Sequence, residues 1–151
     1  MDENLETPRR EQLKAWTKKQ LDTAVRELMN LGVIDSLIIE AKPAWVLPFQ
    51  ILIGKIRARG QSKNFGWFIC GEVPTDFLKS TLAATPRDAA RHFAMKWQLK
   101  AARHRRMASQ EPGGTEPESG QEDPGDQLVF KAEALYSLVD DARLWLQEET
   151  T

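Results

Sequence analysis

The sequence predicts an α+β protein in which a three-stranded antiparallel β-meander has helices packed on one of its faces. Three observations lead to this class. Apolar residues recur at helical spacing near both ends of the chain, three runs between them are rich in β-branched and aromatic residues, and short polar turns separate those runs. Turns of that length favour antiparallel neighbours. The expected order is helix, three strands, short helix, long helix, linker and last helix.

The first helix is expected to begin at Thr7 and Pro8, because a capping hydroxyl followed by a proline suits a first helical turn, and to end at Gly32. Its apolar stripe comprises Leu13, Leu21, Ala24, Leu28 and Leu31, with Trp16 and Val25 at the margins. Its expected polar face comprises Lys19, Asp22, Thr23, Arg26 and Asn30. This pattern is typical of an amphipathic helix packed on the rest of the protein.

The expected strands cover residues 33–40, 45–58 and 65–70, where β-branched and aromatic residues are concentrated. Lys42 and Pro43 would form the first turn, and residues 60–64 the second. Pro48 has no N–H to donate, so the second strand is an edge strand, is bulged at Pro48, or begins after it.

A turn over residues 71–76 should leave the sheet and lead into a short helix through Phe77, Leu78 and Leu82. A long helix then begins at Pro86, with Thr85 as its cap, and continues to about Met107. One narrow face of this helix is apolar, and it comprises Ala90, Phe93, Ala94, Trp97 and Ala101.

The domain organisation predicted from composition is a basic α+β body at residues 1–108, a disordered acidic linker at 109–126 and a C-terminal amphipathic helix at 127–149, all in one domain. The linker has four glycines, three prolines and six acidic residues, and no aliphatic or aromatic residue, so it cannot bury apolar surface. The last helix, capped by Asp126, has an apolar stripe and is expected to dock back onto the body. Docking onto another chain is the alternative.

The net charge of −1 is a cancellation between two oppositely charged parts of the chain. Residues 1–108 contain 19 basic and 11 acidic side chains, whereas residues 109–151 contain 2 basic and 11 acidic ones. Because a flexible tether gives the acidic part a high effective concentration near the basic part, we expect the acidic segment to screen the basic surface.

Membrane and secretory classes are disfavoured by the sequence. No apolar run approaches the roughly 20 residues that a membrane span needs, and residues 1–10 lack the apolar region of a signal peptide. Cys70 is the only cysteine, which rules out an internal disulfide and a cysteine-rich zinc site. We therefore expect a cytoplasmic protein, with Cys70 as an inert thiol in the core.

The helix from Pro86 is the main candidate for an interaction surface because it is strongly basic. Its candidate contact residues are Arg91, Lys96, Lys100 and Arg103. Nucleic acid or another polyanion would fit this charge, but at 100° per residue the charges occupy both flanks of the helix, which is also typical of a solvated helix. Polyanion binding is therefore the alternative function and is expected to be weak.

Other candidates for chemistry are sparse. His92 and His104 have no third metal ligand at motif spacing, and no cofactor-binding motif is present, so we expect neither a metal nor a cofactor. Glu72 and Asp76, in the turn after the third strand, are the only suggestive loop site for an enzyme. Capping by Asp76 and solvation of Glu72 explain both residues without an active site, and this explanation is favoured.

Five tryptophans are distributed one to each main element, and they are expected to meet in the core. Trp45, between Pro43 and Pro48, is the candidate for an exposed tryptophan at an interface.

Two segments, residues 67–78 (WFICGEVPTDFL) and 86–100 (PRDAARHFAMKWQLK), resemble a family of small bacterial cytoplasmic proteins known only as a domain of unknown function. The residues on which this resemblance depends are Gly71, Pro74, Asp76, Pro86, Arg87, Phe93 and Trp97. The resemblance implies no activity, cofactor or catalytic residue, and the acidic linker looks like an extension in this member.

The function predicted from these observations is a non-enzymatic protein–protein interaction or regulatory module with an unknown protein partner. Binding of polyanions by residues 86–107 and an enzyme site at residues 71–76 are the alternatives.

Overall fold

The computed structural model describes residues 3–33, 39–58, 65–110 and 124–146, and it divides the chain into two compact units, residues 1–89 and 90–151. The first unit contains helix α1 (Glu3–Asn30), strands β1 (Ile39–Leu47), β2 (Ile51–Ala58), β3 (Phe65–Gly71) and β4 (Asp76–Lys79), and the 3-10 turn η1 (Ser80–Leu82). Helix α2 (Pro86–Gln110) begins in this unit and continues into the second, which also contains α3 (Pro124–Asp140) and the 3-10 turn η2 (Ala142–Trp145).

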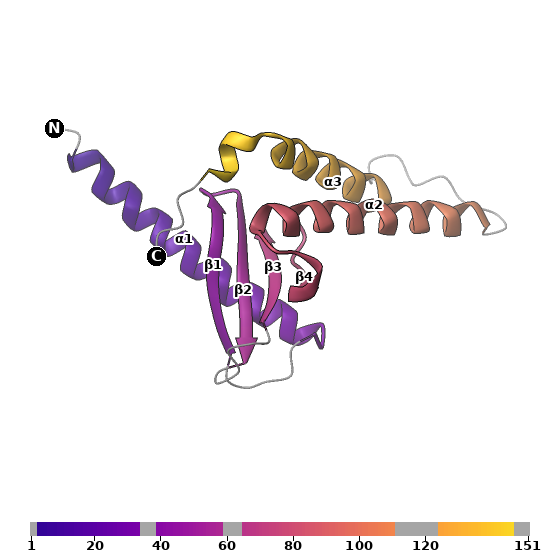
Figure 1. Cartoon of the computed structure of the whole chain (residues 1–151), viewed down its shortest axis with the longest axis horizontal. Helices are drawn as coiled ribbons and strands as arrows, with labels where there is room; N and C mark the ends of the chain where they lie inside the picture. Colours follow the sequence, from indigo (N-terminus) through magenta and orange to yellow (C-terminus); the bar gives the residue numbers. More distant parts are fainter. Residues whose placement is uncertain (1–2, 34–38, 59–64, 111–123, 147–151) are drawn as a thin grey trace. The chain divides into compact units, whose positions relative to one another are not determined.

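The four strands form one antiparallel sheet in the order β1-β2-β3-β4, and α1 crosses one of its faces (Figure 1). The α+β class and the antiparallel meander are therefore confirmed. The sheet has four strands where three were expected, because residues 76–79 pair with β3.

The predicted short helix after the third strand is wrong. Asp76–Lys79 is extended, and the ring of Phe77 packs against the backbone of Gly66 on the neighbouring strand. Only η1 is helical in this stretch. Pairing with β3 satisfies the backbone of a segment whose own pattern suits a helix, so tertiary contacts decide its conformation.

The first strand boundary also differs from the prediction. Lys42 and Pro43 lie inside β1, and the turn to β2 falls at residues 48–50, where the N–H of Gln50 donates to the carbonyl oxygen of Leu47 at 2.9 Å. The strand tolerates Pro43 because it is at the edge of the sheet and the register shifts between Pro43 and Trp45. The second strand begins after Pro48, as one of the three alternatives required. The part of the first predicted strand at residues 34–38 and the turn at 60–64 lie outside the described residues.

Helix α1 begins earlier than predicted, with Pro8 inside it, and ends as predicted. Gly32 has a φ of +74°, and the N–H groups of Gly32 and Val33 donate to the carbonyl oxygens of Met29 and Leu28. This arrangement closes the last turn of the helix. Leu31, expected on the apolar stripe, is 66% exposed because it follows the last residue of the helix.

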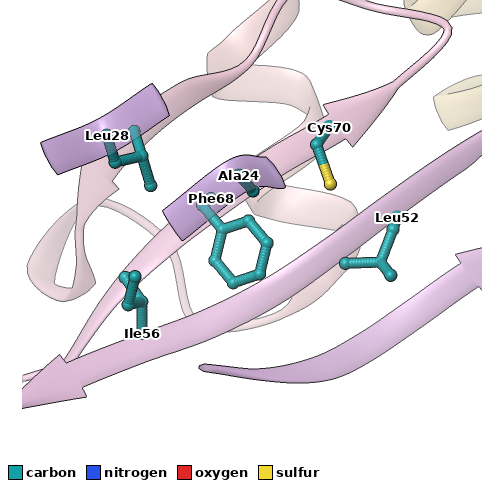
Figure 2. Packing of buried hydrophobic residues seen from close by; sticks show 6 residues of the cluster. All are labelled: Ala24, Leu28, Leu52, Ile56, Phe68 and Cys70. Carbon is teal, nitrogen blue, oxygen red and sulfur yellow. The ribbon is translucent and has the colours of Figure 1, made fainter. Parts of the chain in front are cut away.

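The core of the first unit lies between α1 and the sheet. Ala24 and Leu28 of α1 face Phe68 and residues of β2, as Figure 2 shows, in a buried cluster completed by Leu52, Ile56 and Cys70. The opposite face of the sheet also has buried side chains, among them Ile53, Trp67 and Ile69. The indole N–H of Trp67 donates to the carbonyl oxygen of Ala83 at 3.0 Å.

The start of α2 is confirmed at Pro86, and the Thr85 hydroxyl accepts the N–H of Asp88 at 3.1 Å. The predicted narrow apolar face of α2 is buried throughout. This start was predictable because a hydroxyl cap, a proline and an acidic residue are all local signals.

In the second unit, α3 has three fully buried residues, Ala132, Leu135 and Val139. It begins at Pro124, before the predicted start, so Asp126 lies in the first turn and not at the cap. The helix ends at Asp140, where the carboxylate of Asp141 accepts the N–H of Arg143 and begins η2. Leu146, which follows this break, is 75% exposed. Most of the predicted linker lies outside the described residues.

Candidate binding groove between α1 and β1

A groove of about 1030 Å³ runs between α1 and the edge strand β1, within the first unit. Residues from more than five turns of α1 line one side, and four residues of β1 line the other. The α1 lining extends from Arg10 to Met29, which corresponds to about 28 Å along the helix axis. The groove is open to solvent along this length.

The floor of the groove is apolar. On α1 it is formed by a row of residues four apart, Leu13, Thr17, Leu21, Val25 and Met29. On β1 it is formed by Ile39, Ala41, Pro43 and Val46. Except for the exposed Met29 and Pro43, these side chains are half-buried, so they cover the core from one side and leave apolar surface accessible on the other.

The alternation along β1 explains why these strand residues share the groove. Residues 39, 41 and 43 point to the same face of the sheet because side chains alternate along a strand. The register shift between Pro43 and Trp45 inserts one extra residue into β1. The next side chain on the same face as residues 39, 41 and 43 is therefore that of Val46 and not that of Trp45. Trp45 pairs with Ile53 and belongs to the opposite face.

The edge of the groove is basic. A second row on α1, also at a spacing of four residues, carries Arg10, Lys14, Lys18, Asp22 and Arg26, all of them exposed. Four cations and one carboxylate therefore follow the apolar row along its length. In the described part of the chain, no ion pair is assigned to Lys14, Lys18 or Arg26.

Two contacts hold α1 in place beside the groove. The rings of Trp16 on α1 and Phe49 in the β1–β2 turn pack with centroids 5.9 Å apart. At the same end of the sheet, one turn further along α1, the Sγ of Cys70 lies 3.9 Å from the carbonyl oxygen of Gln20. These contacts connect α1 to the turn after β1 and to β3 at one end of the groove.

Cys70 does not provide a nucleophile. Burial raises the pKa of its thiol to about 12, and the nearby carboxylate of Glu27 adds to this shift. A thiol with such a pKa is protonated at neutral pH, so the expected inert core cysteine is consistent with its surroundings.

The turn after β3 has a structural explanation. Gly71 has a φ of +114° and its Cα lies against the backbone of Gln50, so a side chain there would be strained. The N–H of Glu72 donates to the carbonyl oxygen of Gln50 at 2.7 Å, and its side chain is exposed. The carboxylate of Asp76 accepts the N–H of Phe77 at 2.8 Å. The structure places neither carboxylate in the α1–β1 groove.

The other residues singled out from the sequence lie apart from the groove. Arg91, Lys96, Lys100 and Arg103 are exposed along α2, with Arg91 on a different flank from the other three. Trp45 is 3% exposed, so it lies in the interior and not on the surface for which the sequence singled it out. No group of three potential metal-ligating side chains occurs among the described residues.

Sequence reasoning missed the groove. Asp22 and Arg26 were assigned to the polar face opposite the core, whereas the structure places them along the edge of the groove. The sequence of α1 contains two adjacent rows of residues four apart, one apolar and one basic. This pattern could have indicated the α1 side of the groove. The β1 residues that complete the floor could not be assigned, because the strand boundary was set at Lys42 and Pro43.

Comparison with known proteins gives a family match. The model of the family described as Domain of unknown function (DUF4826) matches residues 10–145, which include most of α1 and all of the sheet, α2 and α3. No curated protein and no solved structure matches the chain. None of the helices in the described part of the chain is long and apolar enough to cross a membrane.

Proposed function

We propose that this chain, which belongs to the family Domain of unknown function (DUF4826), is a non-enzymatic protein–protein interaction module whose binding site is the α1–β1 groove. The observation that carries this proposal is the pairing of an accessible apolar floor with a basic edge over about 28 Å of α1. Exposed apolar surface rimmed by polar side chains is typical of interaction sites.

The shape of the groove favours a polypeptide segment over a small molecule. Small-molecule sites enclose most of their ligand and fix it with a few convergent polar groups. The α1–β1 groove is instead long and open, and its polar groups form a row along one edge. A long ligand can contact the whole basic row on α1, whereas a compact ligand would leave most of the apolar floor exposed to water.

The chemistry of the lining favours binding over catalysis. Among the described residues, the lining side chains are apolar, basic or hydroxyl-bearing, with Asp22 as the only carboxylate and no histidine or cysteine. Such a set has no nucleophile next to a general base. The groove therefore supports recognition through burial of apolar surface and charge pairing.

Site-specific photo-crosslinking in cells of the source organism tests the proposal. A photoreactive amino acid replaces Lys14, which lines the groove, or Gln12, which is also exposed but lies about 200° around the helix and outside the lining. We expect a protein to crosslink at position 14 and not at position 12. That protein is then purified and titrated against the wild-type chain and the Thr17→Trp variant, which places a bulky side chain in the groove.

Thr17 is chosen because it is half-buried and not part of the buried core cluster, so the larger side chain should leave the fold intact. Circular dichroism and thermal unfolding check this point. A loss of affinity of about tenfold or more in Thr17→Trp is the expected result. Equal crosslinking at both positions, or unchanged affinity in a folded Thr17→Trp variant, would overturn the proposal.

A further inference from the structure

We infer that the occupant of the α1–β1 groove is an acidic amphipathic α-helix of a partner protein, bound in one direction along α1. This inference rests on the proposed function and specifies its ligand. It is drawn from the spacing, sign and order of the charges along α1, and from the structure of the β1 edge.

The spacing favours a helix. Both rows on α1 repeat every four residues, which is a rise of about 6 Å, so they form parallel ridges of the kind that pack into the grooves of a second helix. A helix laid in the groove presents its own residues at positions i, i+4 and i+8 at the same interval. An apolar ridge on the partner would then contact Leu21, Val25 and their row, and a neighbouring charged ridge would face the basic row.

The edge of β1 disfavours the other common mode, addition of a strand. Pro43 has no N–H to donate, and the register shift between Pro43 and Trp45 interrupts the edge of the strand. Prolines and bulges are devices that keep sheet edges from pairing with further strands. A polypeptide segment is therefore expected to use side-chain packing in the groove and not main-chain pairing with β1.

The sign of the charge requires an acidic ligand. Four cations and one anion border the apolar floor, and the cations extend over about 24 Å from Arg10 to Arg26. A fatty acid has one carboxylate and could pair with only one end of that row. A bilayer surface presents many phosphates, but it is flat and would not reach the apolar floor between α1 and β1. An acidic amphipathic helix satisfies both the apolar floor and the whole basic row.

The order of the charges sets a direction. Along α1 the row reads Arg10, Lys14, Lys18, Asp22 and Arg26, which is not symmetric on reversal. Acidic partner residues fit opposite the first three, but an acidic residue opposite Asp22 is repelled. A partner with a basic residue at that position fits in one register and one direction, so Asp22 acts as an element of negative selection.

The test uses the full-length protein and two labelled synthetic peptides of about 20 residues with the same leucine stripe. One peptide has Glu at the positions that face the basic row, and the other has Lys there. Binding is measured by fluorescence anisotropy at about 50 mM and about 500 mM salt, because screening weakens charge pairs between exposed groups. The Glu peptide is expected to bind at least about tenfold more tightly at low salt, with the difference reduced at high salt.

Two double variants with the same change in charge separate the groove from general electrostatics. Lys14→Glu with Lys18→Glu reverses two positions of the row, whereas Lys19→Glu with Lys79→Glu changes two exposed lysines that do not line the groove. The first pair should abolish or invert the preference for the Glu peptide. The second pair should lower the affinity only slightly.

The role of Asp22 is measured with a third peptide, which has Lys in place of the Glu that would face Asp22. The wild-type chain should bind this peptide about threefold or more better than the all-Glu peptide, and Asp22→Asn should remove that difference. A difference that persists in Asp22→Asn would overturn the proposed direction.

Equal affinity for the Glu and Lys peptides, or equal effects of the two double variants, would overturn the inference. So would binding to phosphatidylglycerol vesicles without binding to any of the peptides. These results leave the proposed function standing if the protein crosslinked at position 14 still loses affinity in Thr17→Trp, because the site would then be right and its occupant wrong. If crosslinking at position 14 does not exceed crosslinking at position 12, the proposed binding site itself is wrong.

Discussion

Trp16 and Phe49 pack ring against ring, with centroids 5.9 Å apart and planes inclined by 57°. Trp16 is half-buried on α1, and Phe49 has a φ of +63° in the turn between β1 and β2. A non-glycine residue in this backbone region is held there by its surroundings. The pair therefore fixes α1 against the turn that ends β1, the strand that lines the groove.

A double-mutant cycle measures this link. Trp16→Ala and Phe49→Ala should each lower the free energy of unfolding, and the double variant should lose less than the sum of the two, with a coupling of about 0.5–1.5 kcal/mol. Urea unfolding followed by tryptophan fluorescence and circular dichroism provides the values. Additivity within about 0.3 kcal/mol would show that the two rings do not stabilise each other.

Elements with local signals could be predicted from the sequence, and elements defined by pairing could not. The cap at Thr85 and the glycine end of α1 at Gly32 depend on neighbouring residues, and both were placed correctly. The conformation of residues 76–79 and the inclusion of Pro43 in β1 depend on strand partners 7 to 13 residues away along the chain. Sequence patterns do not specify those partners, so both predictions were wrong.

Gly66 and Phe77 provide the next prediction, because a Cβ at position 66 would overlap the Phe77 ring. Gly66→Ala should destabilise the first unit by about 1–3 kcal/mol, since the ring must move away from β3. The penalty of Gly66→Ala should shrink in a Phe77→Ala background, where the ring is absent. Chemical unfolding of the four proteins in the cycle measures it, and an unchanged penalty in that background would assign the cost to the backbone of β3.

The site shows the same limit as the fold. Both α1 rows are visible in the sequence as residues four apart, yet a row of cations beside an apolar row is also typical of an ordinary solvated helix. What makes them a groove is β1, whose residues 39, 41, 43 and 46 lie opposite only because of its register and bulge. The strongest sequence feature, the basic stretch of α2, contributes no residue to this groove.

Cys70 predicts a specific pH dependence of stability. Burial raises the pKa of its thiol in the folded protein to about 12, from an ordinary value near 9. Above about pH 9 the unfolded chain loses this proton while the folded protein keeps it, so the contribution to stability decreases as pH rises towards 12. Each pH unit in that window should cost up to about 1.4 kcal/mol.

Unfolding at pH 7, 9 and about 10.5 in the wild type and in Cys70→Ala measures this effect. The variant lacks the thiol and should lose less stability between the two higher pH values. In the wild type at pH 8, a thiol reagent should modify Cys70 only at the rate of unfolding. Rapid modification of the folded protein would contradict the protonated, buried state.

The acidic segment at residues 109–126 and the basic helix α2 provide the last prediction. Arg105 of α2 pairs with Asp126 at 2.9 Å, and both side chains are more than half exposed. An exposed ion pair contributes at most about 1 kcal/mol to stability. Its relevance here is that it places Asp126, the last residue of the acidic segment, beside α2. Residues 109–126 contain five further acidic side chains, and we expect their covalent connection to α2 to give them a high effective concentration near it.

Neutralising Glu116, Glu118, Glu122 and Asp123 to the corresponding amides should therefore raise the salt concentration at which the protein elutes from a heparin column. The matched control neutralises four acidic residues elsewhere, Asp2, Glu3, Glu6 and Glu11, and changes the net charge equally. A larger shift for the acidic segment than for the control indicates local screening of the basic helix. Equal shifts in the two variants would attribute the change in elution to net charge alone. An unchanged elution would show that the acidic segment does not screen α2.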